Sequence, residues 1–165
     1  SYMSGLFAQM ASLFSIESIN IEIKEIKIWT SPDNYPTNDS FDALSQFIDN
    51  NISMNADLGH LFAMGGQGTG GVAWLDVLCK PGINFAYSNI SSSYNNVPTY
   101  SWSVEVITHE TGHNLGSRHT HACVWNGNNT QIDDCGNKYY YDNGTTLIDI
   151  EGHPCYVPAN PILHA

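Results

Sequence analysis

Three histidines and one glutamate in the segment 109–119 are the residues whose types and spacing could do chemistry together. His109 and His113 are four residues apart, so on a helix they project from the same face and can direct their imidazole nitrogens at one metal ion. Gly116 can adopt the left-handed conformation that ends a helix and turns the chain back, which would bring His119 to the same ion. The spacing therefore predicts a metal site with three histidine ligands.

The predicted ligand set favours zinc and a hydrolytic reaction. Three neutral imidazoles leave the fourth position of zinc open to water, whose pKa the metal lowers toward ~7. Glu110 follows the first ligand directly, so it lies off the ligand axis yet near enough to accept a proton from that water as a general base. Zinc would also polarise a scissile carbonyl and stabilise the resulting oxyanion. We therefore predict hydrolysis of peptide bonds without an acyl-enzyme.

Two simpler interpretations of the motif are less favoured. Chance spacing is an appreciable risk for a His-Glu-x-x-His pattern alone, but Gly116 and His119 at their fixed offsets reduce it greatly. A purely structural zinc site would give Glu110 no evident role, and such sites usually use cysteine ligands and close the fourth position. Hydrolytic chemistry remains the better interpretation.

The surrounding segments predict helices and strands that would position the motif. Helical spacing of apolar residues covers 2–16, 40–50 and 101–115, and apolar runs typical of strands cover 19–29, 57–64, 71–78 and 85–90. Asp39 or Ser40 can cap the second helix. The Gly-rich segment 65–71 lacks the Gly-Lys-Ser/Thr ending of a phosphate-binding loop, so phosphate binding is not expected. Residues after Gly116 are rich in Asn, Asp, Gly and Pro and predict irregular structure.

The composition excludes several classes of protein. A chain of 165 residues with 42% hydrophobic and 13% charged residues is typical of one globular domain, not of a disordered segment. Its net charge of -11 would repel a phosphate backbone, so a nucleic-acid partner is not expected. No run of 18 apolar residues and no signal peptide is found, which predicts a mature soluble chain without a membrane span. We expect a monomer.

Four cysteines favour disulfide bonds. They show no Cys-x-x-Cys spacing, which argues against a zinc ribbon or a thioredoxin-type redox site. Three connectivities are possible, of which a Cys123–Cys135 pair would close a short polar loop. Five Asn-x-Ser/Thr sequons would suit a secreted glycoprotein, although a chain rich in Asn produces sequons by chance. The cysteines are Cys79, Cys123, Cys135 and Cys155.

The motif resembles that of the metzincin metalloproteases, and the run 109–116 is most similar to their adamalysin or reprolysin branch, which includes bacterial secreted members. The run 71–79 resembles the edge strand of that branch and the cysteine that follows it. In the family this strand binds extended substrate by strand addition, through backbone hydrogen bonds. The resemblance gives that substrate-binding role to Gly71, Val72, Ala73 and Trp74.

The resemblance also implies a fold and an activity. It implies a secreted zinc endopeptidase that acts on proteins or peptides, with residues 1–165 forming a single catalytic domain. The fold class would be α+β: a twisted mixed sheet with helices, a zinc-binding helix beneath it, and an irregular lower part after Gly116. Two family elements are not found in the chain, a first strand before the helix 2–16 and a Met-containing turn after His119. We therefore expect a fragment, with the turn beyond Ala165, where the partner of Cys79 could also lie.

Two rival functions stay open. The chain could be a zinc-binding but inactive fragment or binding module, because the absent elements could leave the site unsupported. It could also be a zinc-dependent amidase or peptidase acting on cell-wall peptides, which shares the chemistry and differs only in its pockets.

Other polar and aromatic residues have simpler interpretations. His121 is expected outside the ligand set and His60 in the core, while His153 and His164 are expected in loops. Trp102 and Trp125 are expected to pack or to shield the site. Calcium is possible but not assigned, since no EF-hand spacing exists and a turn is favoured at its candidate ligands. Those candidates are Asn126, Asn128, Asn129, Asp133 and Asp134.

Overall fold

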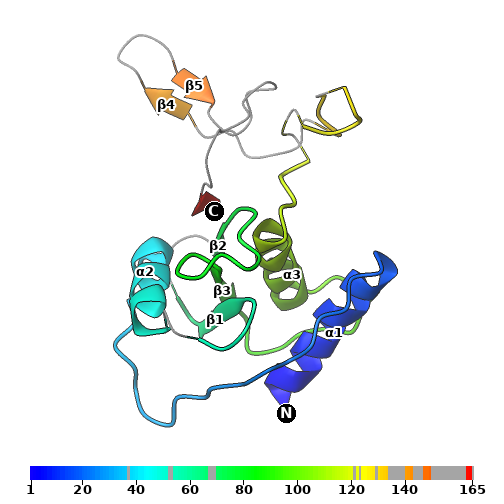
Figure 1. Cartoon of the computed structure of the whole chain (residues 1–165). Helices are drawn as coiled ribbons and strands as arrows, with labels where there is room; N and C mark the ends of the chain where they lie inside the picture. Colours follow the sequence, from blue (N-terminus) through cyan, green and yellow to red (C-terminus); the bar gives the residue numbers. More distant parts are fainter. Residues whose placement is uncertain are drawn as a thin grey trace. The chain divides into compact units, whose positions relative to one another are not determined.

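The computed structural model describes residues 1–36, 38–51, 54–66, 70–120, 122, 124–128, 130–133, 140–142, 147–149 and 163–164. The chain divides into two compact units, Ser1–Gly116 with Leu163–Ala165, and Ser117–Ile162. The first unit contains α1 (Tyr2–Ile16), α2 (Ser40–Asn51), β1 (Gly59–Met64), β2 (Gly71–Trp74), β3 (Phe85–Ile90), α3 (Trp102–Asn114) and β6 (Leu163–His164), as Figure 1 shows. The second contains β4 (Tyr140–Asp142) and β5 (Leu147–Asp149). No helix in the described part of the chain is long and apolar enough to cross a membrane.

The first unit is built on a mixed four-stranded sheet in the order β1-β3-β2-β6. Strand β1 runs parallel to β3, with Gly59 opposite Phe85. Strand β2 runs antiparallel to both of its neighbours, with Val72 opposite Tyr87 on β3 and Trp74 opposite Leu163 on β6. The fold class predicted from the sequence, a mixed α/β sheet with helices, is confirmed.

Alternate residues of each strand face different helices, as the two-residue repeat of a strand requires. On one face, Leu61, Val72, Phe85 and Tyr87 form a buried cluster with Ala43, Leu44 and Phe47 of α2. On the other face, Ile90 packs with Leu6, Met10 and Phe14 of α1 and with Val104, Val106 and Ile107 of α3. Burying each large apolar side chain contributes about 1.5–3 kcal/mol. The sheet therefore lies between α2 on one side and α1 with α3 on the other.

The three predicted helices are confirmed, with ends that follow from local hydrogen bonds. The hydroxyl of Ser1 accepts from the backbone N–H of Ser4 at the start of α1. Asp39 Oδ1 accepts from the backbone N–H groups of Phe41 and Asp42, at 2.8 and 3.1 Å, and so caps α2 as its side chain predicts. The helix predicted for 101–115 is α3, which carries the histidine motif.

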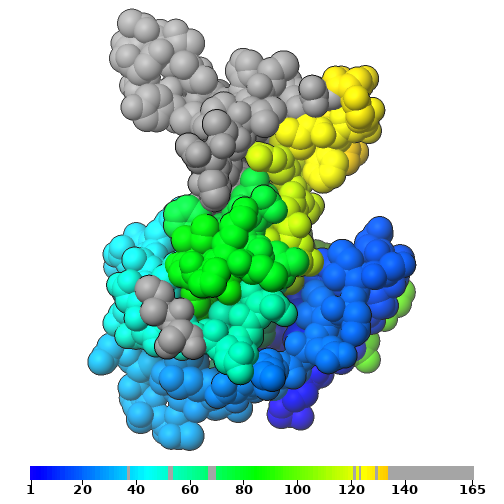
Figure 2. Space-filling model, in the orientation of Figure 1, coloured from blue at the N-terminus to red at the C-terminus, as the bar shows by residue number. Residues whose placement is uncertain are grey.

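The strand predicted for residues 19–29 is wrong. This segment forms no strand, and Ile28 is 65% exposed. A strand needs a neighbouring backbone to pair with. In the described residues β1, at one edge of the sheet, pairs only with β3, so segment 19–29 does not add a strand beside it. The segment instead crosses the surface of the first unit, where Figure 2 shows it among the lighter blue atoms. Ile21 and Trp29 pack against the two core clusters, which fixes the segment without pairing it.

Two other predictions of secondary structure need smaller corrections. The run 71–78 is a strand only as far as Trp74, because Asp76 and Cys79 have positive φ values of 54° and 58° and turn the chain. The part after Gly116 was predicted to be irregular, yet β4 and β5 pair antiparallel within the second unit. Within the residues that the structure describes, Cys79 is exposed and forms no disulfide, whereas the predicted Cys123–Cys135 pair lies outside them.

Candidate metal centre

Helix α3 presents the histidine motif and ends where the motif requires a turn. The helix begins after Ser101 and ends at Asn114, with Leu115 as its C-cap. Gly116 has a φ of 101°, which side chains rarely tolerate, and its N–H donates to the carbonyl of His113 at 2.9 Å. The predicted glycine turn after the second histidine is confirmed.

The three predicted ligands come together. The Nε2 atoms of His109 and His113 lie 2.9 Å apart. One potential ligand atom from each of His109, His113 and His119 lies within 4.8 Å of the others. Two nitrogens bound to one tetrahedral zinc at the usual bond length are about 3.4 Å apart, so this spacing suits a common ion. In the part of the chain that the structure describes, this is the group that could hold a metal ion.

The chemistry of the donor set also fits zinc. Imidazole is a good zinc ligand, and catalytic zinc sites commonly use three protein ligands and keep one position open. His113 is 2% exposed, whereas His109 is exposed and His119 is intermediate. One side of the histidine cluster is therefore open to solvent at His109. The residues therefore fit a reactive zinc site.

Glu110 is buried between α3 and strand β2. Its side chain is 2% exposed, although it belongs to the same helical turn as the exposed His109. The carboxylate lies against the backbone of Gly71, so close that a Cβ atom at Gly71 would stand 2.5 Å from Oε1. Glu110 is thus held between the helix of the ligands and the strand predicted to bind substrate.

Asn114 joins the motif helix to the sheet, a role that the sequence analysis missed. Its side chain is 1% exposed, and Nδ2 donates to the carbonyl oxygens of Trp74 at 2.8 Å and Phe85 at 3.2 Å. Backbone N–H groups of Asp76 and Val77 donate to the carbonyls of His113 and Asn114, each at 2.9 Å. These bonds fix the end of β2 against the end of α3.

His60 forms a polar contact within the core, as the sequence analysis predicted. Its Nε2 lies 2.8 Å from Ser88 Oγ on β3, and its Nδ1 lies 3.3 Å from Thr111 Oγ1 on α3. The hydroxyl of Ser88 in turn donates to the carbonyl of Val106 on α3. His60 therefore links the sheet to the middle of the motif helix, and burial lowers its pKa to about 3.

The lowered pKa of His60 predicts a pH-dependent stability. Between pH 6.5 and 3 the unfolded chain binds a proton at His60 and the folded chain does not. The free energy of unfolding should therefore fall as pH falls through this window, by at most about 1.4 kcal/mol per pH unit from this group. Urea unfolding at several pH values would measure it. The H60Q variant, which cannot titrate there, should show a shallower dependence; parallel curves for parent and variant would contradict the assignment.

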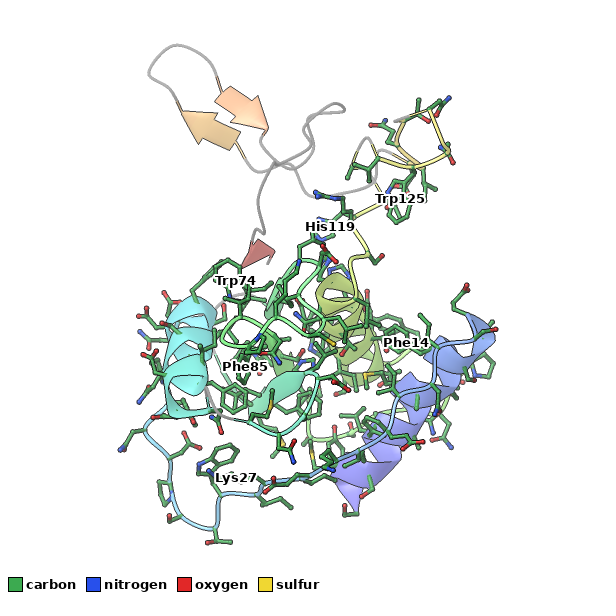
Figure 3. The ribbon with its side chains drawn as sticks, in the orientation of Figure 1. Phe14, Lys27, Trp74, Phe85, His119 and Trp125 are labelled. Atoms are coloured by element: carbon green, nitrogen blue, oxygen red, sulfur yellow. The ribbon has the colours of Figure 1, made fainter. Side chains whose placement is uncertain are left out.

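His119 is held by an aromatic residue further along the chain. The indole N–H of Trp125 donates to the carbonyl of His119 at 2.9 Å, and Figure 3 labels both residues. Trp125 itself is bridged to Thr130 across a short turn. From the sequence, Trp125 was expected only to pack or to shield the site, so this hydrogen bond is a further contact that holds the third predicted ligand.

Of the calcium candidates that the structure describes, Asn126 and Asn128 lie in a turn, as the sequence favoured. Asn128 Oδ1 accepts from the hydroxyl of Thr130 at 2.7 Å, and Asp133 Oδ1 accepts from the hydroxyl of Thr120 at 3.0 Å. Asn126 donates to the same Thr130 hydroxyl. Of the remaining residues, Asn129, Asp134, His121 and His153 lie outside the described residues, as does the side chain of His164.

The four residues predicted to bind substrate make up β2. Gly71, Val72 and Ala73 pair with β3 on one side. On the other side Ala73 and Trp74 pair antiparallel with β6. In this structure β6 therefore pairs with part of the edge that strand addition would use.

Comparison with known families agrees with the site. A reprolysin-type model, described as metallo-peptidase family M12, matches residues 1–149. The chain belongs to this family. The family implies zinc-dependent peptidase activity and substrates that are proteins or peptides, and the histidine cluster suits the zinc. No curated protein matches the chain.

Proposed function

We propose that this M12 metallopeptidase is a zinc endopeptidase in which Glu110 is the general base. The observation that carries the proposal is the place of Glu110, a buried carboxylate on the helix that presents His109 and His113, packed against strand β2. Zinc bound by His109, His113 and His119 would supply Lewis acidity and lower the pKa of a water molecule.

Glu110 would move the proton that hydrolysis requires. Its carboxylate would accept a proton from the water that attacks the scissile carbonyl and later deliver it to the amine nitrogen of the leaving product. One water molecule is added across the broken C–N bond, so no other reactant is needed. Burial of Glu110 favours this proton transfer, because a carboxylate shielded from bulk water interacts more strongly with nearby charge.

The proposed substrate is an extended stretch of polypeptide lying along β2. Backbone pairing at Gly71, Val72, Ala73 and Trp74 would hold the peptide without reading its side chains. The antiparallel pairing of β2 with β6 supports this, because it places an extended segment along the same edge. An edge pairing of this kind needs no chain terminus, which favours cleavage within a chain. Secretion and a monomeric state remain predictions.

The experiment is digestion of an unfolded protein, followed by mass spectrometry of the products, with and without a chelator. Internal cleavage that stops on chelation is expected. Release of terminal residues only would contradict the endopeptidase assignment, and cleavage confined to cell-wall peptides would favour the amidase alternative. Zinc binding without cleavage of any of these substrates would favour the inactive binding module.

A further inference from the structure

Gly71 occupies the point where strand β2 meets the proposed general base. The neighbouring residues Val72 and Trp74 pack on the α2 side of the sheet, so Gly71 faces the α3 side. Glu110 lies on that side, and its carboxylate contacts the glycine backbone. The missing side chain at position 71 leaves the space that this carboxylate fills.

The fit leaves no room for even one methyl group. A Cβ atom at Gly71 would lie 2.5 Å from Oε1 of Glu110 and 2.7 Å from both Cδ and Cγ, distances that real Cβ atoms essentially never show. The strand cannot easily move away, because Asn114 and the backbone of Asp76 fasten the end of β2 to α3. Relief would have to come from the Glu110 side chain.

The backbone at Gly71 does not itself require glycine. Its φ is outside the left-handed region that Gly65, Gly82, Gly116 and Gly127 occupy, and its backbone bonds belong to the sheet. An alanine can adopt strand geometry and retain the same ladder bonds. The need for glycine at this position therefore comes from the carboxylate opposite it.

We infer that Gly71 is a positioning residue that sets the place of the Glu110 carboxylate. The inference rests on the proposed function. It gives strand β2 a second role, the positioning of the general base, which depends on Gly71 having no side chain. The pairing of β2 with substrate and the placement of the base would then both depend on this one strand.

The test is the G71A variant, with G70A as its matched control. Alanine at position 70 would also overlap a side chain, but that of Trp102, which is 42% exposed and can move outward. For G71A we expect kcat to fall about 100-fold. General base catalysis supplies a rate enhancement of about 10²–10⁴-fold, and a displaced base loses much of it. The KM and the zinc affinity should stay within about threefold, because backbone pairing and the ligands are unchanged. For G70A, kcat should stay within about threefold of the parent value.

The E110D variant distinguishes displacement of the base from general damage. Its shorter side chain leaves room for a methyl group, so adding G71A to E110D should cost less than about tenfold, and the two effects should not multiply. A crystal structure of G71A should show the Glu110 carboxylate moved and β2 in place.

Each outcome bears on one claim. A kcat for G71A equal to that of the parent, an equal loss in G70A, or an unmoved carboxylate in the G71A structure would overturn the inference and leave the proposed function standing. A parent protein that cleaves nothing would overturn the proposed function, while the G71A structure would still decide whether Gly71 positions Glu110.

Discussion

Replacing Glu110 with glutamine is expected to lower kcat for peptide cleavage by about 10³-fold. Glutamine has the shape of glutamate but its amide cannot accept the proton of the attacking water. The side chain is 2% exposed, so bulk solvent is poorly placed to substitute for it. Steady-state cleavage of a fluorogenic peptide by zinc-loaded parent and variant measures the effect.

The control for this prediction lies on the same helix. Glu105 is exposed in the first turn of α3, where its carboxylate accepts from the hydroxyl of Tyr100. The E105Q variant makes the same chemical change away from the histidines and should retain the parent rate. Zinc affinity should be unchanged in E110Q, because the ligand atoms belong to histidines. An E110Q variant that cleaves as fast as the parent would contradict the role given to Glu110.

Replacing His113 with alanine is expected to abolish both zinc binding and cleavage. Loss of a partner that only orients a ligand costs 10–100-fold in metal affinity, so loss of a ligand should cost at least about 100-fold. Competition with a chromophoric chelator measures the affinity. Because His113 is buried, H113A also opens a cavity and could weaken the fold.

The H119A variant separates these two effects. His119 is only partly buried and lies beyond the end of α3, so its removal should cost the same zinc affinity with little effect on the unfolding midpoint. The zinc affinity of both variants should fall by similar factors if the three histidines bind one ion. Full zinc affinity in either variant would mean that the ion is bound elsewhere.

The metal ligands could be predicted from sequence because their geometry is local. His109 and His113 are four residues apart, a spacing that places two side chains on the same face of any helix. Gly116, with its positive φ, turns the chain between the end of the helix and His119. Helices α1 and α2 were predictable for the same reason, since their apolar stripes and the Asp39 cap act within a few residues. Local periodicity is sufficient where a segment satisfies its own backbone hydrogen bonds.

The failures concern residues whose roles depend on distant partners. Residues 19–29 carry the alternation of a strand, but alternation supplies no neighbouring strand to pair with. Asn114 contacts Trp74 and Phe85, and Trp125 contacts His119, through bonds that no spacing rule predicts. An asparagine directly after the second histidine, inside the predicted helix, was the one available signal. The closeness of Gly71 to Glu110 likewise appears only once β2 is packed on α3.

Zinc titration of the metal-free protein tests most directly whether one ion at His109, His113 and His119 supports peptide hydrolysis. The cleavage rate should rise in proportion to added zinc and level off at one equivalent, while E110Q should take up the same single equivalent with almost no gain in rate. A metal-free protein that cleaves at the full rate, or a cleavage rate that does not rise with the first equivalent of zinc, would contradict this function.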